Sequence, residues 1–183
     1  MQKENRTVLL HACCAICSAY PIELLKSMGY EVIVHFYNPN IYPKTEYLRR
    51  LEAERELCKY FGVQLIEDEY NEHEFLDYVK GYETCPEKGE RCPLCFELRL
   101  RKTAQLAQQM GIKDFTTSIV ISPHKNFALL SSIGKKIAQE NELNYLDIDF
   151  KKKDGFLKTN KIANGLNLYR QNYCGCRFSF PSL

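Results

Sequence analysis

The chain has 183 residues, of which 45% are apolar, so it can bury a core as one domain and is not intrinsically disordered. It contains no run of about 18 apolar residues, and its apolar segment 8–25 lacks the charged start and unbroken middle of a signal peptide, so we expect a cytoplasmic protein without a membrane span. The net charge of +2 hides a basic C-terminal segment, 150–183, with seven Lys or Arg and one Asp. Such a segment either contacts phosphates or is only a solvated surface.

The hydrophobic pattern predicts alternating strands and helices. Short apolar, β-branched runs between turn residues indicate strands, and apolar positions three or four residues apart indicate helices. In chain order the pattern predicts a strand at 7–10, a loop at 12–16, a helix at 17–28, a strand at 32–37, a helix at 44–61, a strand at 63–66, a short helix within 71–82, a helix at 93–110, a strand at 115–121, a helix at 126–141 and a strand at 145–148. Beyond residue 150 the chain is weakly periodic, and we expect it to wrap back over the domain.

This order predicts an α/β fold, a parallel sheet with helices on both faces, in one domain over 1–183 whose last part is the basic segment. Functional loops in such folds lie at the carboxyl ends of the strands. The loop at 12–16, the turn after Tyr37 and the segment 122–125 should therefore meet at one edge of the sheet. In the helix at 44–61, we expect Leu48, Leu51, Cys58 and Phe61 to form the buried stripe, which makes Cys58 a core residue.

The cysteines form a pattern of their own. There are nine, an odd number and too few for a disulfide scaffold, and in a reduced compartment they indicate metal binding more than cross-linking. Their close spacing lets neighbouring thiolates reach one metal centre, and the helix start expected at residue 93 favours thiolates through its positive potential. Seven of them fall in three groups, which are Cys13, Cys14 and Cys17, then Cys92 and Cys95, then Cys174 and Cys176.

Seven thiols exceed what one common metal site requires. A structural zinc site takes four ligands, and a [4Fe–4S] cluster takes at most four cysteines. The excess of soft ligands favours iron–sulfur over zinc, either as a cluster with an open iron or as a cluster beside a second ion. Spacing alone does not separate these metals.

Five motifs, in order along almost the whole chain, resemble those of the QueH-type epoxyqueuosine reductases. One departure is Ile16, where the family usually has Pro, which loosens the loop without removing a ligand. The motifs are His11-Ala-Cys-Cys-Ala-Ile-Cys17, Tyr37-Asn-Pro-Asn-Ile41, Arg91-Cys-Pro-Leu-Cys-Phe-Glu-Leu-Arg-Leu100, Ser122-Pro-His-Lys-Asn126 and Tyr169-Arg-Gln-Asn-Tyr-Cys-Gly-Cys176.

The resemblance implies reduction of epoxyqueuosine to queuosine at the wobble position of tRNAs with a GUN anticodon, those for Tyr, His, Asn and Asp. It implies a [4Fe–4S] cluster, with or without a second iron ion, an unidentified electron donor and no cobalamin. It also implies a Rossmann-like fold related to nucleotide-binding and tRNA-thiolating enzymes. Where those enzymes have a phosphate-binding Ser-Gly-Gly loop, this chain has His11-Ala-Cys-Cys, which argues against ATP cleavage.

Under this interpretation the seven grouped cysteines are the metal ligands, and the candidate catalytic residues are His11 and Asp149. His11 either donates a proton or only hydrogen-bonds the loop, and Asp149 either ligates a second iron or caps a strand end. The candidate substrate-binding residues include tyrosines that could stack on a base and cations that could hold phosphate. They are Tyr37, Asn38, His124, Lys125, Tyr169, Arg170 and Tyr173.

Two other functions stay open at this point. A zinc-stabilised nucleic-acid-binding module would use the same cysteines and basic segment without catalysis. A cluster-dependent tRNA sulfur-transfer enzyme would in addition need ATP.

Overall fold

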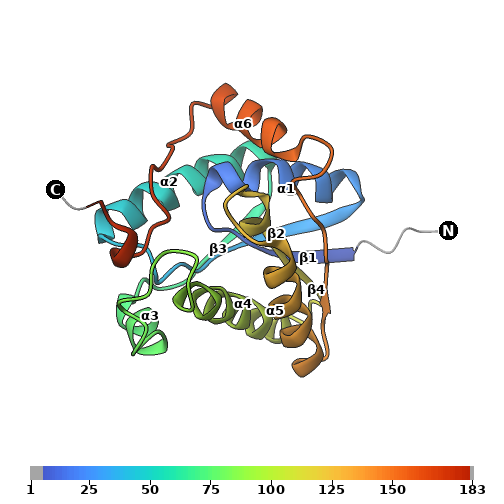
Figure 1. Ribbon diagram of the computed structural model, residues 1–183. Coiled ribbons are helices and arrows are strands. Elements are labelled where there is room, and N and C mark those ends of the chain that lie inside the picture. Colours follow the sequence, from blue (N-terminus) through green and yellow to red (C-terminus); the bar gives the residue numbers. More distant parts are fainter. Residues whose placement is uncertain (1–5, 182–183) are drawn as a thin grey trace.

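The computed structural model describes residues 6–181 and contains one parallel sheet of five strands (Figure 1). The strand order is β3-β2-β1-β4-β5, with β1 (Arg6–His11) at the centre. Its neighbours are β2 (Tyr30–Phe36) and β4 (Asp114–Thr117), and β3 (Gln64–Glu67) and β5 (Asn144–Tyr145) form the edges. Every pair is parallel, which confirms the predicted sheet.

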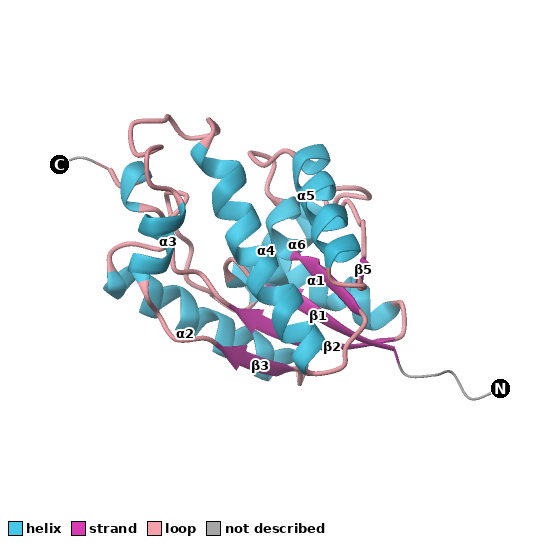
Figure 2. Ribbon diagram, turned by 90° about the horizontal axis from the view of Figure 1, so that it is seen from below, coloured by secondary structure: helices cyan, strands magenta, loops and turns pink. Residues whose placement is uncertain are grey.

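Helices cover both faces of this sheet (Figure 1). On one face lie α1 (Ala15–Ser27), α2 (Lys44–Phe61) and α6 (Gly155–Gly165), and α1 packs against both of the others. On the other face α4 (Arg91–Gln109) packs against α5 (Phe127–Glu140). The short α3 (Glu72–Tyr78) lies beside α4, close to the end of the described chain, in both views (Figure 2).

The core follows from this double covering. The central strand has no exposed face, so Val8, Leu9 and Leu10 are consecutive apolar residues and all are fully buried. Phe115 of β4 and Val34 of β2 flank them and are equally buried. Because helices cover both faces of the sheet, a functional site can form only at the ends of the strands. No helix within residues 6–181 is long and apolar enough to cross a membrane.

The bounds of α2 are as predicted, and Leu51 and Cys58 of the expected stripe are buried, but the rest of its buried face differs from the prediction. Leu48 is 49% exposed, whereas Glu46, Arg50 and Glu54, which follow one another at four-residue spacing, are buried together with Leu51. A run of charges on a helix is usually its solvated side, and only tertiary partners for those charges reverse this. The partners come from segments distant in sequence and are described below.

Two predicted strands are shorter in the structure. The strand expected at 115–121 ends at Thr117, whose side chain accepts a hydrogen bond from the Ile119 amide and starts a 3₁₀ helix, η1 (Ser118–Ile121). The strand expected at 145–148 is reduced to β5. The β-branched residues of η1 are buried outside the sheet. Their composition predicted a strand because it indicated burial, but it did not determine the backbone conformation.

Helix α6 was not predicted. Its buried residues are Gly155, Thr159 and Ala163, at four-residue spacing, and a stripe of small residues gives little apolar periodicity. Thr159 also accepts a hydrogen bond from the Tyr20 amide on α1 at 3.2 Å. After α6 the chain returns across the molecule and ends near α3 (Figures 1 and 2).

The burial of Cys58 yields a first prediction. Its side chain is 3% exposed within the main core, and burial raises the pKa of its thiol. Cys58→Ala should lower the free energy of unfolding by about 1 kcal/mol, through lost packing, without altering iron content. Denaturant unfolding and iron analysis of the same preparation test this, and a folded variant depleted of iron would contradict the assignment of Cys58 to the core.

Candidate metal centre

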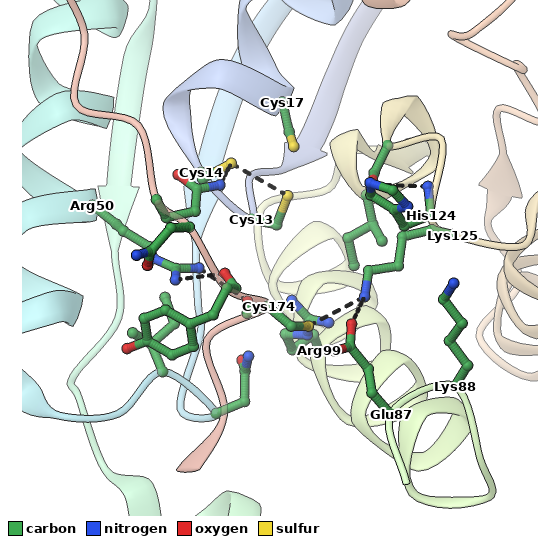
Figure 3. A pocket seen from close by; sticks show the side chains of 17 residues that line it. Cys13, Cys14, Cys17, Arg50, Glu87, Lys88, Arg99, His124, Lys125 and Cys174 are labelled. Atoms are coloured by element: carbon green, nitrogen blue, oxygen red, sulfur yellow. Dashed lines mark hydrogen bonds and ion pairs between the residues drawn. The ribbon is translucent and has the colours of Figure 1, made fainter. Parts of the chain in front are cut away.

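A pocket of about 650 Å³ opens at the carboxyl edge of the sheet (Figure 3). Its walls include the loop after β1, residues 40–41 after β2, residues 87–88 before α4, segment 122–125 after η1 and tail residues 171–174. Arg50 of α2 and Arg99 of α4 complete it. The predicted meeting of the loop after the first strand, the turn after Tyr37 and segment 122–125 at one edge is confirmed.

The first cysteine group forms a compact set, here named the three-thiol set: Cys13, Cys14 and Cys17. One sulfur from each lies within 4.8 Å of the others, and the Cys13 and Cys14 sulfurs are 4.0 Å apart. Helix α1 begins at Ala15, so Cys14 is its N-cap and Cys17 lies in its first turn. The Cys13 amide donates to Ser118 Oγ at 3.2 Å, and Gln171 Nε2 donates to Cys14 Sγ at 2.8 Å.

These three thiols do not ionise independently. Hydrogen bonds from Cys14 and Cys17 lower the pKa of Cys13, with smaller contributions from Ser118 and Arg99. The same contact with Cys13 raises the pKa of Cys17. One thiolate is therefore favoured, and a second or third needs a cation that compensates the repulsion, which is how a bound metal displaces thiol protons.

The other two cysteine groups come together as a second set, the four-thiol set: Cys92, Cys95, Cys174 and Cys176. Cys92 and Cys95 lie at the start of α4, and Cys95 and Cys176 share a small apolar cluster with Phe75. Burial, augmented by the charges of Cys174, Cys176 and Cys92, raises the pKa of Cys95 to about 11. Among these four cysteines only Cys174 lines the pocket together with the three-thiol set.

Arg99 lies between the two sets. Its side chain is 4% exposed, its Nε donates to the Cys95 carbonyl at 3.2 Å, and its Nη1 donates to Asn38 Oδ1 at 3.4 Å. Burial disfavours the charged guanidinium, but the thiolates of Cys95, Cys13 and Cys174 outweigh burial and raise the pKa of Arg99. Arg99 was not among the predicted site residues, although it lies four residues after Cys95 within the motif Arg91–Leu100.

A second cation, Lys125 of segment 122–125, contacts Cys174 of the four-thiol set. Its Nζ donates to Cys174 Sγ at 3.2 Å and lies 3.5 Å from Glu87 Oε1 (Figure 3). Lys125, His124 and Tyr173 are the predicted substrate-binding residues that line the pocket. The Tyr173 hydroxyl donates to the Tyr42 carbonyl, so this ring has a fixed position in the wall.

The other four predicted substrate-binding residues are outside the pocket lining. The Tyr37 hydroxyl donates to Glu74 at 2.5 Å, and Asn38 Nδ2 donates to the Ala12 carbonyl at 2.8 Å. The Tyr169 hydroxyl donates to Glu46 at 2.7 Å. Arg170 is exposed and donates to Asn160 on α6 at 2.7 Å. In these positions they hold loops and the tail in place.

Neither candidate catalytic residue lines the pocket. His11 is fully buried, with Nδ1 3.0 Å from Thr117 Oγ1 and Nε2 3.1 Å from the Tyr37 carbonyl. Because a carbonyl only accepts, Nε2 carries the hydrogen and Nδ1 accepts from Thr117. Burial lowers the pKa of His11 to about 3, so the ring is neutral and fixes the loop. Asp149 Oδ1 accepts from the Lys151 amide at 3.1 Å, an arrangement that favours the capping alternative.

Glu54 is a buried acid behind the three-thiol set that the sequence analysis missed. It is fully buried, its Oε2 lies 3.2 Å from Ser18 Oγ, and no donor within residues 6–181 reaches its Oε1. Ser18 Oγ is also 3.0 Å from the Cys14 carbonyl. Burial raises the pKa of Glu54 to about 8.

The Glu54 environment predicts a pH dependence of stability. Between pH 4.5 and about 8 the folded protein holds a proton that the unfolded chain has released, so the free energy of unfolding falls as pH rises. Glu54→Gln stays neutral, so its stability relative to wild type should rise across this window by up to about 1.4 kcal/mol per pH unit. Urea unfolding at several pH values tests this, with the exposed Glu56→Gln as control. Parallel pH profiles for Glu54→Gln and wild type would contradict a neutral Glu54.

The fold and this pocket define a class: a Rossmann-like α/β protein with a cysteine-lined pocket at the carboxyl edge of its sheet. A family model described as epoxyqueuosine reductase QueH matches residues 8–182. The chain belongs to this QueH family.

Individual relatives carry the same name. The epoxyqueuosine reductase QueH of Staphylococcus epidermidis is 39% identical over 184 residues, covering 96% of this chain and 77% of the relative. That of Streptococcus pyogenes is 37% identical, covering 94% and 70%. That of Dehalococcoides mccartyi is 36% identical, covering 94% and 91%.

A solved structure shares the fold. It is the U34-tRNA thiolase NcsA from Methanococcus maripaludis with its [4Fe-4S] cluster, with a TM-score of 0.60 and 14% identity. The match covers 97% of this chain and 62% of that one. At this identity the likeness establishes the architecture, a Rossmann-like α/β sheet, as predicted.

Proposed function

We propose that this protein is an iron–sulfur oxidoreductase that reduces epoxyqueuosine to queuosine in tRNA, at the wobble position of GUN anticodons, without cobalamin. The observation that carries the proposal is that the three-thiol set and Cys174 line one pocket of a QueH-family chain, with the rest of the four-thiol set beside Cys174. The electrons would come from an external reductant, either a protein or a small molecule.

The chemistry of the donor sets fits two iron centres. Four sulfurs around one tetrahedral ion, with bonds of about 2.3 Å, lie about 3.8 Å apart. The 4.0 Å separation of the Cys13 and Cys14 sulfurs matches this spacing, so the three-thiol set suits a single ion with a fourth position open. The four-thiol set offers the four ligands that a [4Fe–4S] cluster takes. The cluster in the NcsA structure supports the compatibility of such a cluster with this fold.

The reaction defines what the pocket residues must do. Converting an epoxide to an alkene consumes two electrons and two protons and releases water. Bound iron would supply the electrons and a Lewis-acidic position for the oxygen. Among the side chains that line the pocket, Lys125, at Nζ, is one that can hold a proton for the reaction, whereas His11 supports the loop. Arg99 keeps its charge and balances the thiolates.

The pocket dimensions and surroundings suit a nucleoside in tRNA. Its volume of about 650 Å³ lies in the range of small-molecule sites, and a base must leave its stack to enter. Lys151 Nζ donates to the Lys125 carbonyl at 3.2 Å, so the basic turn at 151–153 adjoins the pocket. Lys152 and Lys153 are exposed there and are placed to meet phosphates of the anticodon stem-loop.

Nucleoside mass analysis tests the function and the ligand assignment together. Anaerobically purified protein with a strong reductant should convert epoxyqueuosine in tRNA to queuosine. Cys17→Ala should lose about one iron per chain and Cys95→Ala about four, both with loss of turnover, while Cys58→Ala keeps both. A colourless protein with stoichiometric zinc would instead favour the nucleic-acid-binding module, and ATP-dependent thiolation would favour sulfur transfer.

A separate prediction concerns tRNA binding. Replacing Lys151, Lys152 and Lys153 together by Ala should weaken binding and reduce the slope of log K against log salt by about 2, because fewer counterions are released. Lys135 and Lys136 on α5 are exposed and form ion pairs, and their double Ala variant is the control. Filter binding over a salt series measures both slopes. An unchanged slope in the triple variant would contradict the assignment of tRNA binding to the turn at 151–153.

A further inference from the structure

Arg50 connects α2 to the tail segment that carries the last two cysteines. Its side chain is 3% exposed, and Nε donates to Glu46 Oε1 at 2.8 Å. Nη1 donates to the Cys174 carbonyl at 3.0 Å and Nη2 to the Tyr173 carbonyl at 3.1 Å (Figure 3). The guanidinium also lies 5.2 Å from the centre of the Tyr173 ring. The Arg50 side chain therefore donates three hydrogen bonds, one to Glu46 and two to the carbonyls of neighbouring tail residues. The face of its guanidinium also packs on the Tyr173 ring.

The contact is close on the tail side as well. Gly175 has φ +128°, and a Cβ there would lie 2.9 Å from Arg50 Nη1. The Gly175 carbonyl accepts from the Tyr42 amide at 2.7 Å. Residues 173–175 thus have all three carbonyls bound, although this part of the tail lies outside the sheet and the helices. Buried carbonyls without a strand neighbour need such donors, and a guanidinium provides them in fixed directions.

We propose that Arg50, oriented by Glu46, is a positioning residue that holds segment 173–176 so that Cys174 and Cys176 complete the four-thiol set. Glu46 is 6% exposed and binds Arg50 with one carboxylate oxygen. Its second oxygen binds the tail, because it accepts from the Tyr169 hydroxyl at 2.7 Å. The inference uses the proposed function only in taking Cys174 and Cys176 as iron ligands.

The substitution Arg50→Lys separates geometry from charge. Lysine keeps the positive charge but cannot direct three donors to Glu46 and two carbonyls at once. The carbonyls that lose their donor favour an opened tail, and the loss of about 1.4 kcal/mol of local stability corresponds to a tenfold larger opened fraction. Arg49→Lys is the matched control, because Arg49 is the exposed neighbour on the same helix.

The test follows alkylation of reduced, metal-free protein by iodoacetamide, with peptide mass analysis of each cysteine. In Arg50→Lys, Cys174 and Cys176 should react about tenfold faster than in wild type, while Cys13, Cys14 and Cys17 keep their rates. Arg49→Lys should match wild type at every cysteine. After anaerobic reconstitution, the affinity of Arg50→Lys for the iron of the four-thiol set should be about tenfold weaker than that of wild type, while the iron of the three-thiol set is retained.

Wild-type alkylation rates at Cys174 and Cys176 in Arg50→Lys would overturn the proposal, as would an equal rise at all seven thiols. If Arg50→Lys does not fold, Gly175→Ala decides, because it keeps the Arg50 side chain and disturbs the same contact by placing a Cβ 2.9 Å from Arg50 Nη1. In Gly175→Ala the alkylation rates of Cys174 and Cys176 should rise selectively in the same way. Unchanged rates at these two cysteines would refute the positioning role of Arg50. Alkylation needs neither iron nor tRNA, so it tests the role of Arg50 even if the protein has no reductase activity.

Discussion

The reversal of strand order at β1 is the constraint on which the site depends. The chain adds β2 and β3 on one side of β1 and then β4 and β5 on the other, so the segments after β1 and β4 leave the sheet in different directions. A crevice forms where they diverge, at the carboxyl ends of two buried strands. Cys13 and Ser118 meet there because their strands are neighbours in the sheet, although 105 residues separate them. Both faces of the sheet are covered, so this edge is where backbone and side chains are left available for chemistry.

Bringing thiolates together at such an edge is unfavourable because like charges repel, and three cationic side chains lie beside them: Arg50 and Arg99 are buried, and Lys125 is partly buried. Arg99 lies between the two thiol sets, Lys125 contacts Cys174 from the loop before α5, and Arg50 binds the backbone beside it. Each is held by an element of the main fold rather than by the tail. The positive charge is therefore in place before metal or substrate arrives, and it favours anionic centres in this pocket.

The sequence was informative where neighbouring residues carry the signal. The parallel sheet, the bounds of α2 and the meeting of three loops could be predicted, because hydrophobic period and turn residues act over a few positions. The division of seven cysteines into two sets could not, because it depends on which loops face each other. Arg50 was hidden for a different reason: a buried charge has the same sequence pattern as a solvated helix surface, and its partners lie 123 and 124 residues away. Tyr37 and Tyr169 suggested base stacking, yet their hydroxyls are bound by Glu74 and Glu46.

The tail that supplies Cys174 and Cys176 is also the last part of the described chain to be synthesised. When a ribosome has completed all five strands and α6, the three-thiol set already has its sheet edge, but Cys92 and Cys95 still lack their partners. The four-thiol set can assemble only once the nascent chain has emerged and the tail has crossed back to α2. The four-thiol set is in this way complete only after residues 174–176 have been synthesised, so that a product terminated after α6 would retain the sheet while lacking two of the four sulfurs.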